Sequence, residues 1–115
     1  MYKRQTGGGS GIGAELAKIL SKDKYTVYIS GRTKLKLSNI AKYNESIIPV
    51  HGDVSSLKDC KKIVNTIHKK FKKINLVVMN AATYSPGSME ILNVDEIRKV
   101  VDINLMGVIL SLIHI

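Results

Sequence analysis

Short apolar runs alternate along the chain with patterns in which apolar residues recur every three or four positions. The runs are rich in β-branched and aromatic residues, which predicts strands over residues 25–29, 47–50 and 76–79. The recurring patterns predict amphipathic helices over residues 11–20, 34–43 and 56–71, and from residue 94 onward. Strands and helices in alternation form βαβ units with parallel strands and right-handed crossovers. The pattern therefore predicts one α/β domain.

Length and composition narrow the class of protein. A chain of 115 residues supplies one modest core, and 44% hydrophobic with 23% charged residues is ordinary globular usage. The longest apolar stretch, residues 105–115, is shorter than the ~20 residues that a membrane span needs, and no secretory signal follows Met1. A single cysteine, Cys60, excludes an internal disulfide framework and fits a reducing compartment. We expect a cytoplasmic protein with no membrane partner.

A glycine-rich turn precedes the first predicted helix. From Thr6 to Gly13 the chain reads Thr-Gly-Gly-Gly-Ser-Gly-Ile-Gly. Glycines let the backbone approach a pyrophosphate, and the first turn of a helix offers free N–H groups and a favourable dipole. A Walker P-loop is excluded, because neither Lys-Ser nor Lys-Thr follows Gly13. A flexible loop or a helix cap is the alternative, but the position before a helix in a βαβ pattern favours nucleotide binding.

Motifs spread over nearly the whole chain resemble those of the short-chain dehydrogenase/reductase family. The first is the glycine turn, whose Thr-Gly-x-x-x-Gly-x-Gly spacing is the family's rather than that of the general dinucleotide fingerprint. In the second, Asn80-Ala81-Ala82 resembles the family's Asn-Asn-Ala-Gly motif, with Met79 and Thr83 in place of the first Asn and the Gly. In the third, Gly52-Asp53-Val54 resembles the family's adenine-binding segment. In the fourth, residues 102–107 resemble the helix segment that carries the family's catalytic asparagine.

The resemblance implies a Rossmann-like doubly wound parallel sheet and hydride transfer between a nicotinamide cofactor and a small-molecule carbonyl or secondary alcohol. It implies a catalytic role for Asn104, which in the family bends its helix and holds a water through its carbonyl. Taken without the family, Asn104 could equally be a satisfied core residue, and Asp53 a turn-capping residue before Ser55. The cofactor-binding residues implied are Gly7, Ser10, Gly11, Ile12, Gly13, Arg32, Asp53, Val54, Asn80, Ala81 and Ala82.

The residues after the second predicted strand indicate which nicotinamide cofactor is bound. A site for NAD usually places a carboxylate there for the ribose 2′-hydroxyl. This chain reads Ser30-Gly31-Arg32-Thr33-Lys34, with two cations and no carboxylate. An arginine can form charge-assisted hydrogen bonds with a 2′-phosphate, and the family resemblance points the same way. We therefore expect NADP, with NAD the less favoured alternative.

The chain is strongly basic, with a formal net charge of +9. Much of the excess falls on and after the third predicted helix, opposite its apolar stripe. These lysines lack the interleaved aromatics of a single-strand binder, so a solvated helix face is favoured over a nucleic-acid site. No nucleic-acid partner is expected, and the histidines and Cys60 show no metal-ligand spacing. The lysines concerned are Lys61, Lys62, Lys69, Lys70, Lys72 and Lys73.

Both ends of the chain are predicted to be non-native. The strand before the glycine turn should be apolar and central, yet it contains Lys3 and Arg4, and burial of two cations there is prohibitively unfavourable. A DNA stretch that encodes residues 1–5, with GTG read as the starting Met1, can be the reverse complement of one that encodes residues 110–114. Such an inverted repeat at the two ends resembles adapter sequence rather than protein-coding sequence. We therefore exclude residues 1–5 and 110–115 from the fold, which leaves 6–109 as a partial NADP-binding domain. The predicted sheet has a degraded first strand and no C-terminal strands.

The sequence contains no Tyr-x-x-x-Lys, the pair that acts with a serine in the family's chemistry. The resemblance thus implies a fragment of an enzyme, and we expect no oxidoreductase activity from the chain as written. The parent is expected to be a homo-oligomer. Two alternatives are a non-catalytic nucleotide-binding module and, less favoured, a basic interaction protein.

Overall fold

The computed structural model describes residues 1–71, 73–87, 93–113 and 115. Its parallel sheet has the strand order β3-β2-β1-β4, with the strands β1 (Tyr2–Thr6), β2 (Thr26–Gly31), β3 (Ile47–His51) and β4 (Leu76–Val78). The helices are α1 (Gly11–Lys22), α2 (Lys34–Ala41), α3 (Leu57–His68), α4 (Val94–Val101) and α5 (Gly107–Leu112), with the π-helical segment η1 (Asp102–Met106) between the last two. The predicted α/β class is confirmed.

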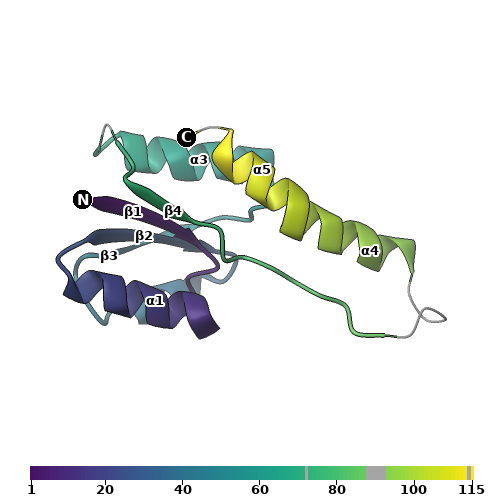
Figure 1. Cartoon of the computed structure of the whole chain (residues 1–115), viewed down its shortest axis with the longest axis horizontal. Helices are drawn as coiled ribbons and strands as arrows, with labels where there is room; N and C mark the ends of the chain where they lie inside the picture. Colours follow the sequence, from purple (N-terminus) through teal and green to yellow (C-terminus); the bar gives the residue numbers. More distant parts are fainter. Residues whose placement is uncertain (72, 88–92, 114) are drawn as a thin grey trace.

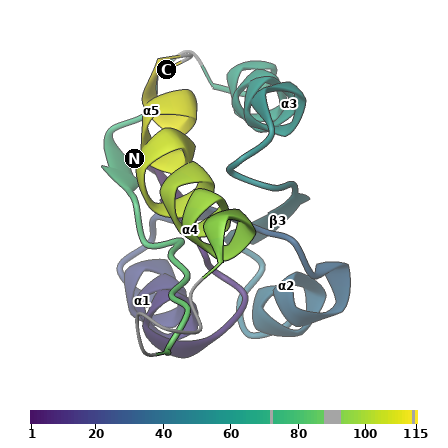
Figure 2. The same cartoon turned by 90° about the vertical axis from the view of Figure 1, so that its right-hand side faces the viewer.

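Helices cover both faces of the sheet, as the Rossmann-like doubly wound prediction requires. Figure 2 shows α1 and α2 on one side of the strands and α3 with α5 on the other. Side chains of β2 alternate between the two layers: Val27 and Ile29 pack with Leu37 of α2, whereas Tyr28 packs with Ile63 of α3. This alternation follows from the two-residue period of a strand. Figure 1 shows α4 extending beyond the strands. None of the helices that the structure describes is long and apolar enough to cross a membrane.

The first five residues correct the sequence analysis. Residues 2–6 form β1, which pairs in parallel with β2 on one side and β4 on the other, so residues 1–5 are not outside the fold. The two cations are accommodated separately. The Lys3 ammonium lies 3.5 Å from the centre of the Tyr25 ring, and Arg4 is fully buried with Nη1 donating to the Ser111 carbonyl oxygen at 2.7 Å.

The accommodation of Arg4 is incomplete. Its Nε and Nη2 atoms, together with Oε1 of Gln5, are buried without a hydrogen-bond partner. Burial lowers the pKa of the Arg4 guanidinium. At the other end, residues 110–112 belong to α5, and Ser111 is buried with its carbonyl oxygen against Arg4 of β1 and its hydroxyl 3.9 Å from Sγ of Cys60 on α3. Both ends are thus part of the fold, and the non-native origin of these residues stays a prediction.

Candidate functional site

A trough of about 270 Å³ lies at the carboxyl ends of the strands. All strands run in the same direction, so the loops that follow them gather at one edge of the sheet (Figure 1). Here β1 has β2 on one side and β4 on the other, and ligands of open α/β sheets bind at such a change of direction. The residues that line the trough are Gly7, Gly9, Ser10, Gly31, Arg32, Thr33, Lys36, Leu37, Gly52, Asp53, Val54, Asn80, Ala81, Ala82 and Ile103.

The glycine turn lines this trough with bare backbone. Gly7 and Gly11 have φ angles of +65° and +54°, which side chains rarely adopt. A Cβ atom on Gly7 would lie 2.9 Å from Nδ2 of Asn80, and one on Gly13 would collide with the Gly7 carbonyl oxygen. At Gly11, by contrast, nothing lies within 4 Å of such an atom. The turn is therefore tightly packed against the protein and open on its outer side.

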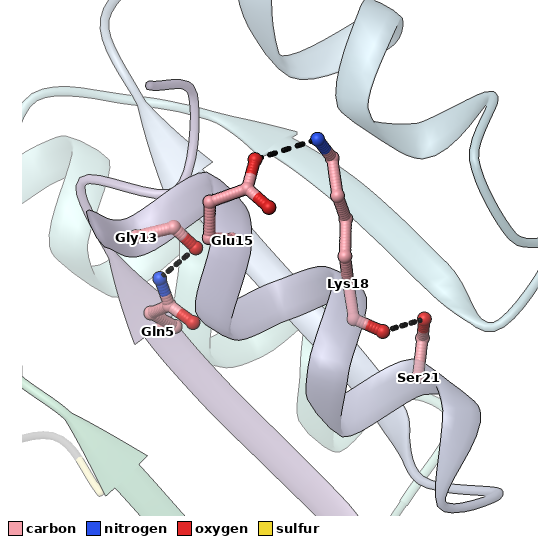
Figure 3. A network of polar contacts seen from close by, with 5 residues as sticks. All are labelled: Gln5, Gly13, Glu15, Lys18 and Ser21. Carbon is pink, nitrogen blue, oxygen red and sulfur yellow. Dashed lines mark hydrogen bonds and ion pairs between the residues drawn. The ribbon is translucent and has the colours of Figure 1, made fainter. Parts of the chain in front are cut away.

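The amino end of α1 follows directly from this turn. Its N-cap residue, Ser10, makes no side-chain capping hydrogen bond, and the first turn of α1 contains no acidic residue. The first N–H groups of the helix thus have no side-chain acceptor among the described residues, and the helix dipole favours an anion there. Figure 3 shows Gln5 of β1 donating from Nε2 to the Gly13 carbonyl oxygen, which holds the helix start against the sheet.

Thr6 connects the ends of β1 and β4. Its Oγ1 atom accepts hydrogen bonds from the backbone N–H groups of Asn80 at 2.9 Å and of Ala81 at 3.0 Å. Asn80 in turn donates from Nδ2 to the Gly7 carbonyl oxygen at 3.3 Å. These bonds fix the loop after β4 to the glycine turn. Thr6 was not among the predicted site residues, although it begins the glycine motif and so could have been included.

Asp53 both lines the trough and caps a turn. Its Oδ1 accepts from the backbone N–H of Ser55 at 2.9 Å and from the Ser55 hydroxyl at 2.7 Å, as the turn-capping alternative predicts. Its own N–H donates to Oδ2 of Asp59 at 2.9 Å, which holds the start of α3 against the β3 end. The two interpretations of Asp53 are therefore compatible. Its neighbour Val54 is buried against Gly107 of α5.

The loop after β2 and the start of α2 bring positive charge to the trough. Arg32 lies just beyond β2, and its backbone oxygen is 3.0 Å from Nε2 of His51 at the end of β3. Arg32, Thr33 and Lys36 line the trough here, whereas Lys34, the second cation singled out in the sequence, does not. The first turn of α2 has no acidic residue, and Asp53 is the one carboxylate among the described lining residues.

Asn104 lies outside the trough and is exposed. Its Nδ2 donates to the Thr83 carbonyl oxygen at 2.7 Å, and its Oδ1 accepts from the Thr83 N–H at 2.8 Å. The core alternative for Asn104 is therefore wrong. Asn104 follows Val101 by three residues, on the apolar side of its helix, but Val101 is itself 44% exposed, so this side of the helix is not core within the chain. Ile103 is the buried member of η1 and lines the trough.

The sequence profile of the family described as short chain dehydrogenase matches residues 5–114. The chain belongs to this family. A short-chain dehydrogenase/reductase named PhomF, of Diaporthe leptostromiformis, is 42% identical over 89 residues, which are 75% of this chain and 30% of that protein. The chain therefore spans less than a third of that relative's length.

Two solved structures of similar fold were determined with nicotinamide cofactors. A 3-ketoacyl-(acyl-carrier-protein) reductase of Brucella melitensis, complexed with NADH, is 28% identical with a TM-score of 0.89 over 96% of this chain and 46% of its own. An actinorhodin polyketide ketoreductase with NADPH is 26% identical, with a TM-score of 0.92 over 98% of this chain and 45% of its own. The likeness extends over nearly all of this short-chain dehydrogenase chain.

Within this short-chain dehydrogenase chain, the structure brings most of the predicted cofactor residues to one trough. Three of the predicted residues do not line the trough, namely Gly11, Ile12 and Gly13. Gly13 is buried against the Gly7 carbonyl oxygen, and the Ile12 side chain is 81% exposed. The described residues contain no group of three potential metal ligands. Lining residues that the sequence analysis missed are Gly9, Gly31, Thr33, Lys36, Leu37, Gly52 and Ile103.

Proposed function

We propose that this chain is the cofactor-binding part of an NADP-dependent short-chain oxidoreductase. The parent enzyme would transfer hydride between a nicotinamide and a small-molecule carbonyl or secondary alcohol. The observation that carries the proposal is the trough itself, which is lined both by a bare glycine turn and by Arg32. The relatives with NADH and with NADPH support a nicotinamide cofactor in general.

Each part of the trough has a distinct role in the proposal. The N–H groups at the start of α1 bind the pyrophosphate, because they are bare, lack side-chain acceptors and lie at the positive end of a helix dipole. Asp53 and Val54 hold the adenine, and the Arg32 guanidinium pairs with the 2′-phosphate. Asn80, Ala81 and Ala82 form the wall on the β4 side, which Thr6 fixes in place.

When bound, the nicotinamide supplies or accepts the hydride. Asn104 acts on this chemistry through the loop after β4, since its amide fixes both backbone polar atoms of Thr83. The family's serine and Tyr-x-x-x-Lys have no counterpart in this sequence. We propose that residues 6–109 are the native part of the chain, that the parent supplies these groups, and that the chain by itself does not turn over. A cytoplasmic location and a homo-oligomeric parent belong to the same proposal.

Binding of NADPH and NADH to the purified chain tests the cofactor choice. Arg32→Met should weaken NADPH binding about tenfold, because a charge-assisted contact is lost, and should leave NADH binding within about twofold. Arg98→Met, an exposed arginine on α4, is the matched control and should change neither. Tighter binding of NADH than NADPH by the unaltered chain would refute the proposal.

The proposed lack of turnover is tested separately, by following NADPH oxidation with carbonyl compounds against a heat-inactivated sample. Turnover well above that control would contradict it. Cofactor binding without turnover is also what a non-catalytic nucleotide-binding module would give, and the missing Tyr-x-x-x-Lys favours that second candidate for the isolated chain.

A further inference from the structure

The lining of the trough includes a lysine, Lys36, that the function proposed above does not use. Lys36 is the third residue of α2 and lines the trough with Arg32 and Thr33. We infer that Lys36 is a second specificity-determining residue, which pairs with the 2′-phosphate of NADP beside Arg32. This inference rests on the proposed function, because it assumes that the trough holds a nicotinamide dinucleotide.

Packing across the glycine turn directs Lys36 to this place. A Cβ atom added to Gly9 would lie 3.2 Å from Cβ of Lys36 and 3.7 Å from Cδ2 of Leu37. The start of the Lys36 side chain therefore lies beside the glycine turn, while Arg32 approaches the trough from the β2 end. The two cations stand on either side of Thr33, the N-cap residue of α2. Because Arg32 and Lys36 line the same trough, we expect both flexible side chains to meet a phosphate group bound there.

The charges around Lys36 leave this position suited to an anion. Asp53 is the single carboxylate among the described lining residues, and its Oδ1 is already bonded to Ser55. Thr33 makes no side-chain capping bond, so the N–H groups at the start of α2 add to the positive potential. The ion pair recorded among the described residues, between Lys18 and Glu15, lies elsewhere on α1.

The lysine could instead act on the pyrophosphate, which also carries negative charge. That role would support NADH and NADPH equally, because both contain a pyrophosphate and only NADPH contains a 2′-phosphate. Lys36 lines the trough together with Arg32 and Thr33 of the loop after β2, where the 2′-phosphate is proposed to bind, whereas the pyrophosphate is assigned to the start of α1; this favours the 2′-phosphate. The two roles predict different changes in the ratio of the two affinities, and this ratio is the quantity to measure.

The experiment titrates NADPH and NADH into the full chain and three variants, following the fluorescence of the reduced nicotinamide. Lys36→Met should weaken NADPH binding about tenfold and leave NADH binding within about twofold. Lys34→Met is the matched control, since Lys34 is exposed on the same helix turn but does not line the trough, and it should change neither affinity. Lys36→Arg should restore most of the preference for NADPH, because it keeps the charge.

The outcomes separate this inference from the proposed function. If the unaltered chain prefers NADPH and Lys36→Met keeps that preference, the assignment of Lys36 is wrong while the proposed function stands. An equal loss for both cofactors assigns Lys36 to the pyrophosphate and also overturns the inference. If the unaltered chain binds neither cofactor, or binds both equally, the proposed cofactor choice fails and the inference fails with it.

Discussion

Replacing Arg4 by methionine should stabilise this protein, although Arg4 is central in the sheet. The guanidinium is fully buried, one of its nitrogens is bonded to Ser111, and Nε and Nη2 have no partner. Methionine is unbranched, apolar and flexible, so it can follow the path of the arginine stem without a charge to desolvate. The change removes the unsatisfied donors and keeps most of the packing.

The size of the effect follows from the hydrogen-bond inventory of Arg4. Each buried donor without a partner costs about 1–3 kcal/mol, so removal of two recovers about 2–6 kcal/mol. The Ser111 carbonyl oxygen loses its bond to Nη1, which costs about 1–3 kcal/mol in return. A net gain of about 1–3 kcal/mol results, within the range of about 1–4 kcal/mol for replacement of buried ionic groups by apolar ones.

Urea unfolding followed by circular dichroism measures this gain. A domain of this size loses about 1–1.5 kcal/mol of stability per mole per litre of urea, so the midpoint should rise by about 1–2 M. Lys3→Met is the control: Lys3 is half-buried and its ammonium lies over Tyr25, so its loss should cost about 0.5–1 kcal/mol. A lower midpoint for Arg4→Met at an unchanged slope would refute the accounting, because it would mean that the buried guanidinium is fully satisfied.

Two further predictions concern the site and the pH dependence of stability. Asn104→Ala should raise the hydrogen-exchange rate of the Thr83 amide at least tenfold, because both hydrogen bonds to the Thr83 backbone are lost. Amides of β2 should stay protected and serve as the control. Unchanged exchange at Thr83 would count against the contact. Burial raises the pKa of the Cys60 thiol, so the folded chain keeps this proton at a pH where the unfolded thiol, with a pKa of about 8.5, loses it. The contribution of Cys60 to stability should therefore be complete well below about pH 8.5 and should be lost as the pH rises above that value under reducing conditions. Cys60→Ala should flatten this fall, and an equal slope in both proteins would contradict the assignment.

The hydrophobic pattern predicts most of the architecture because the later strands are locally apolar. Ile29 and Val50 lie in runs that are buried, and a short apolar run between amphipathic helices has few other uses. The first strand escapes this reasoning. Its placement depends on main-chain pairing with strands on both sides, to which Lys3 and Arg4 contribute as well as any other residue. Side-chain polarity alone could not reveal that.

The site shows the same division between local and distant information. The glycine turn can be recognised from the sequence, because positive φ angles and tight contacts with neighbouring atoms allow only glycine at several positions close together in the chain. Lys36 is not, since the sequence gives no reason to prefer it to Lys34 until the packing against Gly9 is known. The family motif singles out Asn104, and its catalytic role stays a prediction; its exposure was not readable from the apolar pattern, because neighbouring apolar residues such as Val101 and Leu105 are themselves exposed.

The two hydrogen bonds that Thr6 accepts have a consequence for the order of folding. They join residues 74 and 75 positions apart in the chain, whereas β1, β2 and β3 pair with their neighbours in sequence. Closing so long a loop carries an entropic cost that shorter pairings avoid, so the β4 segment should dock after the first three strands have assembled. The ligand trough would then be completed only in the final step. Recovery of cofactor binding during refolding should lag behind recovery of the circular dichroism signal, and so report the arrival of β4.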